Sequence, residues 1–388
     1  MNAASATYRD LPPLAGLCSF EEAARPGLSV EESVRRLKRH HWVFRRLHGI
    51  LVARLTAEPV YELKMAFSLH AYLLAEHVAA LRRRVGEMRE PPLGLEAVPD
   101  AALDLVLQEI LCAPTTPELL LGVYERALPA LLAALEGQAA AAHPLADAPT
   151  IRTLRFARQE LKDILEWAAR AMPCLIGPEQ RAEAAPWLAF LDECLVAAGG
   201  MDGTQARPGA GAPPAPRHSE KPFRYDGTPR RDGRFPDPYN MGVNAEVFLY
   251  DDTMPPQPKT LMMYYKRLRE IDVPEMMAGI ITETPGKPWD YYRDMTRQLW
   301  DEARHAMMGE VGFVKLGVDW PRLVRVNFTW SLGLNTQLQP FERHAVLYFI
   351  EQGLMPRTGK RFEWEVAQAA GDPLAATFQD FDWADEVL

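Results

Sequence analysis

One short segment of the chain carries two side chains that a metal ion could use as ligands. It reads WDEARH over residues 300–305. Glu302 and His305 are three positions apart, which places a carboxylate and an imidazole on one face of a helix, where both can bind a single ion. Alone, this spacing is a weak indication, because a charged, solvated helical turn explains it more simply.

A second segment at the end of the sequence repeats half of this pattern. It reads DWADEVL over residues 382–388, and Glu386 takes the place that Glu302 has in the first segment. The position that would complete a second E-x-x-H is 389, and the segment stops without the Gly, Pro or polar tail that usually ends a helix. We therefore expect this sequence to be cut within a fourth helix. In the natural chain that helix would continue, with a histidine as its next residue.

The two segments resemble the ferritin-like superfamily of carboxylate di-iron proteins, and within it an uncharacterised, oxidase-like bacterial branch. In this superfamily two helices of a four-helix bundle each give one Glu and the other two each give an E-x-x-H. The resemblance covers about residues 255–388 and is carried mainly by PWDYYRDMTRQLWDEARHAMMGEVGFVKLG. It implies a centre of two irons, or of manganese and iron, that activates dioxygen to oxidise an unidentified small substrate, with an electron donor as a possible partner. It implies no catalytic residue beyond the metal ligands.

Helix geometry selects the carboxylate of the first bundle helix. If helices over 259–283 and 289–316 are antiparallel about a turn near residue 286, Glu270 lies level with Glu302, each about 16 residues from the turn. Glu275 is off this level by roughly 10 Å at ~1.5 Å per residue. A kink at Pro274 would bring Glu275 back, so it stays as the alternative.

The third bundle helix offers two carboxylates. Glu351 precedes Glu386 by about as many residues as Glu270 precedes Glu302, so the two halves of the site match. Glu342 follows Pro340 and more simply stabilises the start of its own helix, and it stays as the alternative. The predicted metal ligands are Glu270, Glu302, His305, Glu351 and Glu386.

Hydrophobic periodicity predicts an all-α chain in two helical halves. Helices are expected over 31–50, 60–89, 101–112, 116–138, 150–172 and 179–198, and then over 259–283, 289–316, 320–352, 361–370 and 372–388. Residues 199–240 contain 15 Gly or Pro in 42 positions, which is typical of a linker or a long surface excursion. The predicted organisation is a helical domain over 1–198, this Pro/Gly-rich linker, and a ferritin-like metal-binding domain over 241–388.

The helix predicted over 60–89, in the first half, contains a partial repeat of the metal-site pattern. Leu74 stands where the ligand Glu would be, whereas Glu62, His70 and His77 fall near one helical face, which Glu160 could approach from another helix. Because a ligand carboxylate is replaced by Leu74, we expect a degenerate ferritin-like repeat without metal.

Composition limits the remaining classes of function. Lys and Arg total 43 against 52 Asp and Glu, so the net charge of −9 gives no general basic field for nucleic acid or an anionic membrane. There is no apolar run long enough to span a membrane and no exporting segment, and the four scattered cysteines suit reduced core thiols. We expect a soluble, cytoplasmic protein. A metal-free helical scaffold or interaction protein and an iron-oxidising storage protein are the alternative functions.

Overall fold

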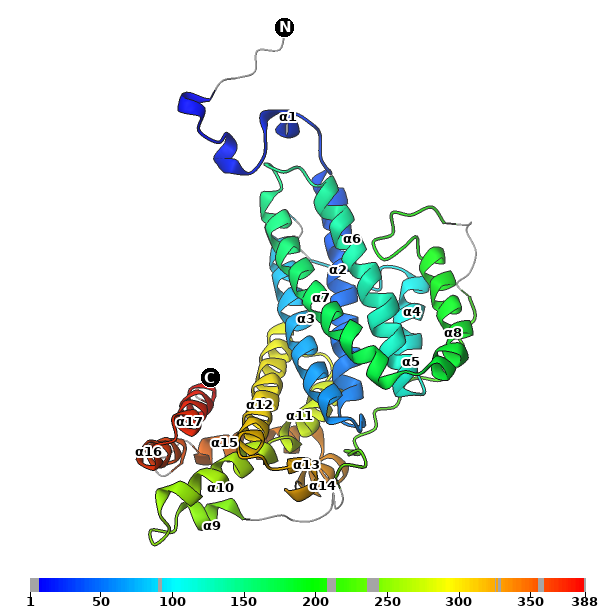
Figure 1. Cartoon of the computed structure of the whole chain (residues 1–388). Coiled ribbons are helices and arrows are strands. Elements are labelled where there is room, and N and C mark those ends of the chain that lie inside the picture. The colour runs from blue at the N-terminus through cyan, green and yellow to red at the C-terminus, as the bar shows by residue number, and fades with distance from the viewer. Residues whose placement is uncertain are drawn as a thin grey trace. The chain divides into compact units, whose positions relative to one another are not determined.

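The computed structural model describes residues 7–89, 93–207, 214–235, 244–324, 326, 329–354 and 359–386. Every regular element within these ranges is helical and none is a strand, which confirms the predicted all-α class (Figure 1). None of the described helices combines the length and the apolar character that crossing a membrane requires.

The chain divides into two compact units, each made of two separate stretches. The first unit comprises residues 1–47 and 73–223, and the second comprises 48–72 and 224–388. The division crosses two long helices, α2 (Val30–Leu55) and α3 (Tyr61–Glu87), so the loop end of their hairpin belongs to the second unit. The boundary at residue 223 falls inside the Pro/Gly-rich segment, but the membership of 48–72 is not visible in the sequence.

Long helices make up most of the first unit. Besides α2 and α3 it contains η1 (Tyr8–Asp10), η2 (Leu14–Gly16), α1 (Phe20–Ala23), α4 (Ala101–Leu111), α5 (Thr116–Leu120), η3 (Leu121–Ala127), α6 (Leu128–Ala141), α7 (Ala148–Leu175) and α8 (Pro178–Ala197). Gln138 on α6 donates to the backbone oxygen of Ser33 on α2 at 3.2 Å, and Arg84 on α3 donates to Thr150 on α7 at 2.8 Å. These contacts tie the long helices together in pairs.

The described part of the Pro/Gly-rich segment up to residue 223 is an ordered excursion on the surface of the first unit. Arg39 donates to the backbone oxygen of Met201 at 2.8 Å. Further along, the carboxylate of Glu109 accepts the backbone N–H groups of residues 217–219 at 2.9 to 3.1 Å. Buried partners therefore hold the segment in place despite its composition.

The second unit contains shorter helices than the sequence predicts. They are α9 (Ala245–Leu249), α10 (Pro256–Arg269), α11 (Asp272–Glu283), α12 (Trp289–Lys315), α13 (Trp320–Leu323), α14 (Thr329–Gln337), α15 (Pro340–Leu354), α16 (Lys360–Ala370) and α17 (Pro373–Asp385). The single helix predicted over 259–283 is wrong, because the chain breaks at 270–271 and Pro274 lies in the first turn of α11, where its missing N–H breaks no hydrogen bond. The single helix predicted over 320–352 is also wrong, because Pro340 begins a new helix. The predicted continuation of the fourth helix past Leu388 stays a prediction, because residues 387–388 already lie outside the described residues.

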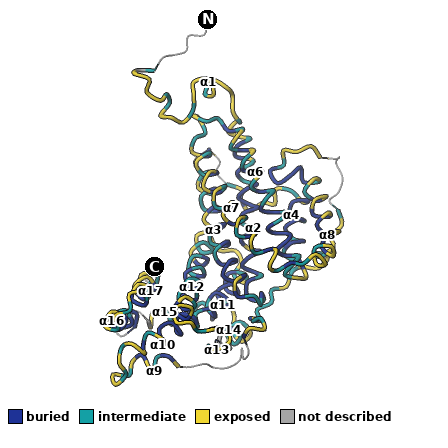
Figure 2. The backbone as a smooth tube through the Cα atoms, in the orientation of Figure 1, coloured by how far each residue is buried: buried dark blue, intermediate teal, exposed yellow. Residues whose placement is uncertain are grey.

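Two glycines let α10 pack closely against α12. A Cβ atom at Gly309 would lie 2.4 Å from the backbone nitrogen of Leu268, and one at Gly312 would lie 2.3 Å from the ring of Tyr264. Only glycine allows so close an approach of a helix to a neighbouring backbone. Buried positions follow α10, α11 and the inner side of α12 (Figure 2). This contact places the end of α10, where Glu270 lies, beside the centre of α12.

Candidate metal centre

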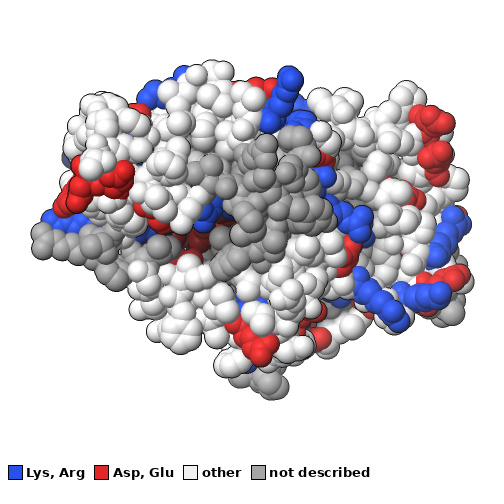
Figure 3. Space-filling model, turned by 90° about the horizontal axis from the view of Figure 1, so that it is seen from below, with Lys and Arg blue, Asp and Glu red and all other residues white. Residues whose placement is uncertain are grey.

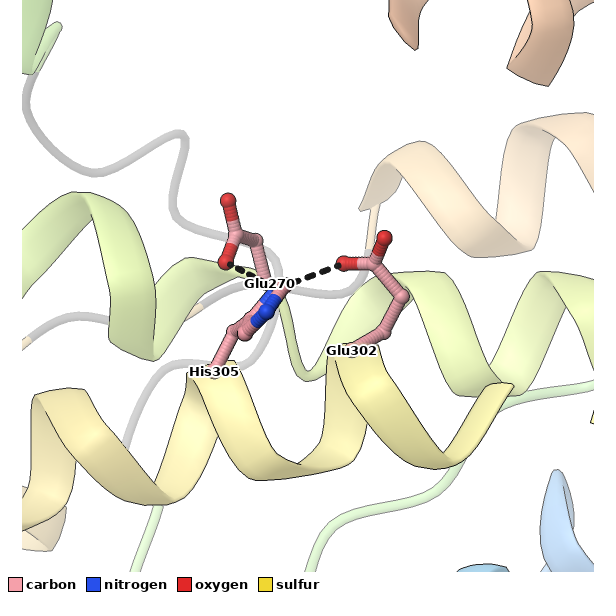
Figure 4. Close-up of side chains that lie close together, drawn as sticks. All are labelled: Glu270, Glu302 and His305. Carbon is pink, nitrogen blue, oxygen red and sulfur yellow. Dashed lines mark ion pairs between the residues drawn. The ribbon is translucent and has the colours of Figure 1, made fainter. Parts of the chain in front are cut away.

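Glu302 and His305 project from the same face of α12, and Glu270 approaches them from the end of α10 (Figure 4). The side chains of Glu302 and His305 are 3% and 1% exposed. The Nδ1 atom of His305 lies 3.8 Å from Oε2 of Glu302 and 3.6 Å from Oε2 of Glu270. The E-x-x-H spacing therefore brings a carboxylate and an imidazole together, and the close contact of α10 adds a second carboxylate.

Helix α17 completes the surroundings of this nitrogen. Nδ1 of His305 lies 3.4 Å from Oδ1 of Asp382 and 3.8 Å from Oε1 of Glu386. Asp382 and Glu386 are four positions apart, which places them on one helical face. With Glu270 and Glu302, four carboxylates thus surround one imidazole nitrogen.

The other ring nitrogen of His305 has a separate partner. Nε2 lies 3.2 Å from Oδ2 of Asp385, which also accepts a hydrogen bond from Arg304 at 2.8 Å. With Nε2 donating a hydrogen bond to Asp385, Nδ1 is the nitrogen directed at the four carboxylates, and it can bind a metal ion once it has lost its own proton. This is the arrangement in which a carboxylate orients a metal-binding histidine.

Three overlapping groups of side chains have ligand atoms within 4.8 Å of one another. They are Glu270, Glu302 and His305; His305, Asp382 and Glu386; and Glu302, Glu351 and Glu386. All five residues that the sequence predicts as ligands are brought into these groups, with Glu351 supplied by α15. Asp382 is the residue that sequence analysis missed, and the signal was its spacing from Glu386 on one helical face.

Two buried cations also enter the cluster. Arg267 is fully buried, lies 2.9 Å from Oε1 of Glu270 and is paired with Asp382. Nζ of Lys360 lies 2.8 Å from Oδ1 of Asp382 and 3.2 Å from Oε1 of Glu386. No local sequence pattern indicates these two residues, because Lys and Arg are usually exposed.

The acidic crowding changes the proton affinities of the cluster. Burial and the hydrogen bond with Glu386 raise the pKa of Glu351 well above its ordinary value. Burial lowers the pKa of His305, but its hydrogen bond with Asp385 and the negative charges of Glu302 and Glu270 outweigh this and raise the pKa to about 9. The metal-free cluster therefore holds protons on Glu351 and His305 at neutral pH, since the fixed cations do not balance its negative charge.

Several ligand-type atoms of the cluster are buried without a hydrogen-bond partner. They are Nδ1 of His305, Oε2 of Glu270, Oε2 of Glu351 and Oδ2 of Asp382. Unpaired buried polar atoms are costly, and most such atoms in folded proteins have a partner. Carboxylate oxygens and an imidazole nitrogen are ligands that suit iron and manganese. The unpaired atoms and the donor set both fit a bound metal ion.

The two alternative carboxylates lie elsewhere in the second unit. Glu275 is buried in a separate ionic cluster, where its carboxylate accepts hydrogen bonds from Lys64 and Arg231. Burial raises the pKa of Glu275, but the charges of these two cations outweigh it and lower the pKa. Glu342 is exposed and accepts the backbone N–H of Gln339 at 2.8 Å, which is the helix-start role predicted for it.

The residues of the partial repeat in the helix over 60–89 do not form one cluster. Glu62 belongs to the second unit and pairs with Arg234 at 2.7 Å. His77 belongs to the first unit and pairs with Glu160 at 2.7 Å. Among the described residues, the groups with ligand spacing all lie in the second unit. The absence of metal from the first half stays a prediction.

Comparison with known proteins does not assign the chain to a family. It matches no protein-family model, no curated protein and no solved structure. On the face drawn in Figure 3, basic and acidic side chains are interspersed and form no continuous basic surface. The carboxylate and histidine cluster is therefore the feature of the chain that indicates a function.

Proposed function

We propose that the second unit is a ferritin-like domain that binds two metal ions, two irons or manganese with iron, and that the protein is an oxidase or oxygenase that activates dioxygen to oxidise a small substrate. The observation that supports this most directly is the position of His305. One of its ring nitrogens contacts Asp385, and the other lies 3.4 to 3.8 Å from oxygens of four carboxylates.

The overlap of the ligand groups favours two ions over one. Glu302, His305 and Glu386 each belong to two of the three groups, and the two carboxylates among them have two oxygens each with which to serve two ions. In this proposal α10, α12, α15 and α17 are the four helices of the bundle. The residues that would hold the ions are Glu270, Glu302, His305, Glu351, Asp382 and Glu386.

A bound pair of Fe(II) ions would supply two electrons to dioxygen. The residues of the chain have their own tasks in this proposal. The carboxylates provide hard oxygen ligands that stabilise oxidised iron. Asp385 accepts the hydrogen bond of Nε2, so that Nδ1, once it has lost its proton, is the nitrogen directed at the ions. Burial of Glu302 and His305 keeps water from the ligand atoms.

A metal-free helical scaffold is the second candidate. Arg267 and Lys360 favour it, because they already neutralise part of the acidic charge without any ion. The unpaired nitrogen of His305 argues against it, since a purely structural cluster would pair that atom. Iron content separates the two candidates.

The test is to strip the full chain of metal, reload it anaerobically with Fe(II) and measure bound iron and oxygen uptake. We expect about two irons per chain, as in other carboxylate di-iron bundles. Glu302→Gln and His305→Ala should lose iron and oxygen uptake, whereas Glu342→Gln, at an exposed position on α15, should keep both. Wild-type protein that binds no more iron than His305→Ala would favour the scaffold, and equal loading of all variants would place the metal elsewhere.

A further inference from the structure

The two halves of the cluster are not equivalent in charge. We define the α12 half as Glu270, Glu302 and His305, and the α17 half as Asp382 and Glu386. In the α17 half both carboxylates already contact one buried ammonium group, that of Lys360, at 2.8 and 3.2 Å. In the α12 half Nδ1 of His305 has no hydrogen-bond partner.

The side chain of Lys360 can move away from Asp382 and Glu386 when another cation binds them. It is the first residue of α16, its side chain is 1% exposed, and Nζ reaches Asp382 and Glu386 at the end of a flexible four-carbon chain. Arg267 is different, because its planar guanidinium is paired with carboxylates on three elements, Glu270, Glu363 and Asp382. Of the two cations, Lys360 can withdraw with less disturbance of its surroundings.

We propose that Lys360 is a placeholder cation, whose ammonium group occupies the α17 half until a second metal ion displaces it. The two ions then bind in order, the first at the α12 half and the second in place of the ammonium group. This inference rests on the metal centre proposed above. It adds the order in which the two ions bind and the difference in affinity between the two binding steps.

The physical reason is competition for the same oxygens. An ammonium group and a divalent ion that share Asp382 and Glu386 repel each other strongly at such short distances in a buried site. The second ion must therefore break two buried ion pairs of Lys360 before it gains those ligands. In the α12 half the first ion displaces the proton of His305 and shares Glu270 with Arg267, but it does not have to expel a buried cation from its ligands.

Calorimetric titration of metal-stripped full-length protein with Mn(II), without oxygen, tests the order. Wild-type protein should bind two ions in separate steps, the second at least tenfold weaker. Lys360→Met should tighten the second step by about tenfold or more, because the competing charge is gone, and should change the first step by less than about threefold. Lys360→Gln, which keeps a polar side chain of similar length, should give the same gain and serves if Lys360→Met does not fold.

Two controls separate displacement from a general effect of charge. Lys360→Arg keeps the cation, so its second step should stay as weak as in wild-type protein. Lys259→Met removes another buried lysine of the second unit, whose Nζ lies over the ring of Phe362 at 5.8 Å, so both steps should be unchanged.

The outcomes distinguish the inference from the proposed function. Two equally tight ions in wild-type protein, with no change in Lys360→Met, would overturn the placeholder and leave the metal centre standing. The same gain in Lys259→Met would also overturn it. No Mn(II) binding by any variant would overturn both.

Discussion

At the scale of single residues, Asp385 decides which nitrogen of His305 is available. Its carboxylate accepts a hydrogen bond from Nε2 and another from Arg304. Burial raises the pKa of Asp385, but the hydrogen bond with His305 and the charge of Arg304 outweigh it and lower the pKa. Asp385 therefore stays ionised and keeps the histidine in one orientation.

We expect Asp385→Asn to weaken metal binding by about 10- to 100-fold, the usual effect of removing a carboxylate that orients a metal-binding histidine. The amide of the introduced asparagine can still contact Nε2. Because an amide can either donate or accept a hydrogen bond, it no longer requires that Nε2 carry a proton. Asp380→Asn changes an exposed carboxylate on the same helix and is the matched control. Metal affinity measured by competition with a chelator checks this, and equal affinities in the two variants would contradict it.

At the scale of elements, the contact between α10 and α12 sets the distance between Glu270 and His305. Gly309→Ala would force a Cβ atom to within 2.4 Å of the backbone of Leu268. We expect this overpacking to destabilise the protein by roughly 1–3 kcal/mol and, because α10 must shift, to weaken metal binding as well. Urea unfolding and metal affinity are the two measurements.

The control for this substitution is Gly333→Ala, inside α14, where a Cβ atom would meet nothing within 4 Å. It should be neutral or stabilising by about 0.5–1 kcal/mol, because alanine favours a helix over glycine. Similar effects of the two substitutions would mean that the close contact at Gly309 does not position α10.

The elements and the site differ in how far the sequence predicts them. Periodicity gives the helical class, but it does not show the break at 270–271, because the apolar pattern continues across these residues and Pro274 by itself indicates only a kink. Spacing and helix level bring out Glu270, Glu302 and His305 because these depend on local geometry. Lys360 and the hairpin tip over 48–72 escape prediction because they reach their positions only through tertiary packing, which leaves no local pattern.

At the scale of the whole molecule, buried histidines make the stability depend on pH. Burial lowers the pKa of His41 to about 3 and that of His40 to about 4, and the ring nitrogens of His41 have no hydrogen-bond partner. In the unfolded chain each titrates near ~6.5. Below that pH the unfolded state therefore binds more protons than the folded state, and stability falls as the pH falls from about 6.5 toward 4 and 3.

We expect His41→Leu to remove one of these contributions. Between pH 7 and pH 5, metal-free wild-type protein should lose roughly 2 kcal/mol more stability than the variant, at about 1.4 kcal/mol per pH unit below ~6.5. The leucine also avoids burying two unpaired ring nitrogens, so the variant should be no less stable at pH 7. Urea unfolding at both pH values checks this, and parallel losses in the two proteins would contradict it.

The hairpin tip over 48–72 has a consequence for how this protein could have arisen. Lys64 pairs with Glu275 and Tyr61 donates to Glu310 at 3.0 Å, so the second unit draws part of its interior from the first quarter of the chain. A gene fragment that starts after the Pro/Gly-rich segment would encode that unit without these partners. The halves are therefore not interchangeable modules, and a recombination event at this segment would separate residues that must be inherited together.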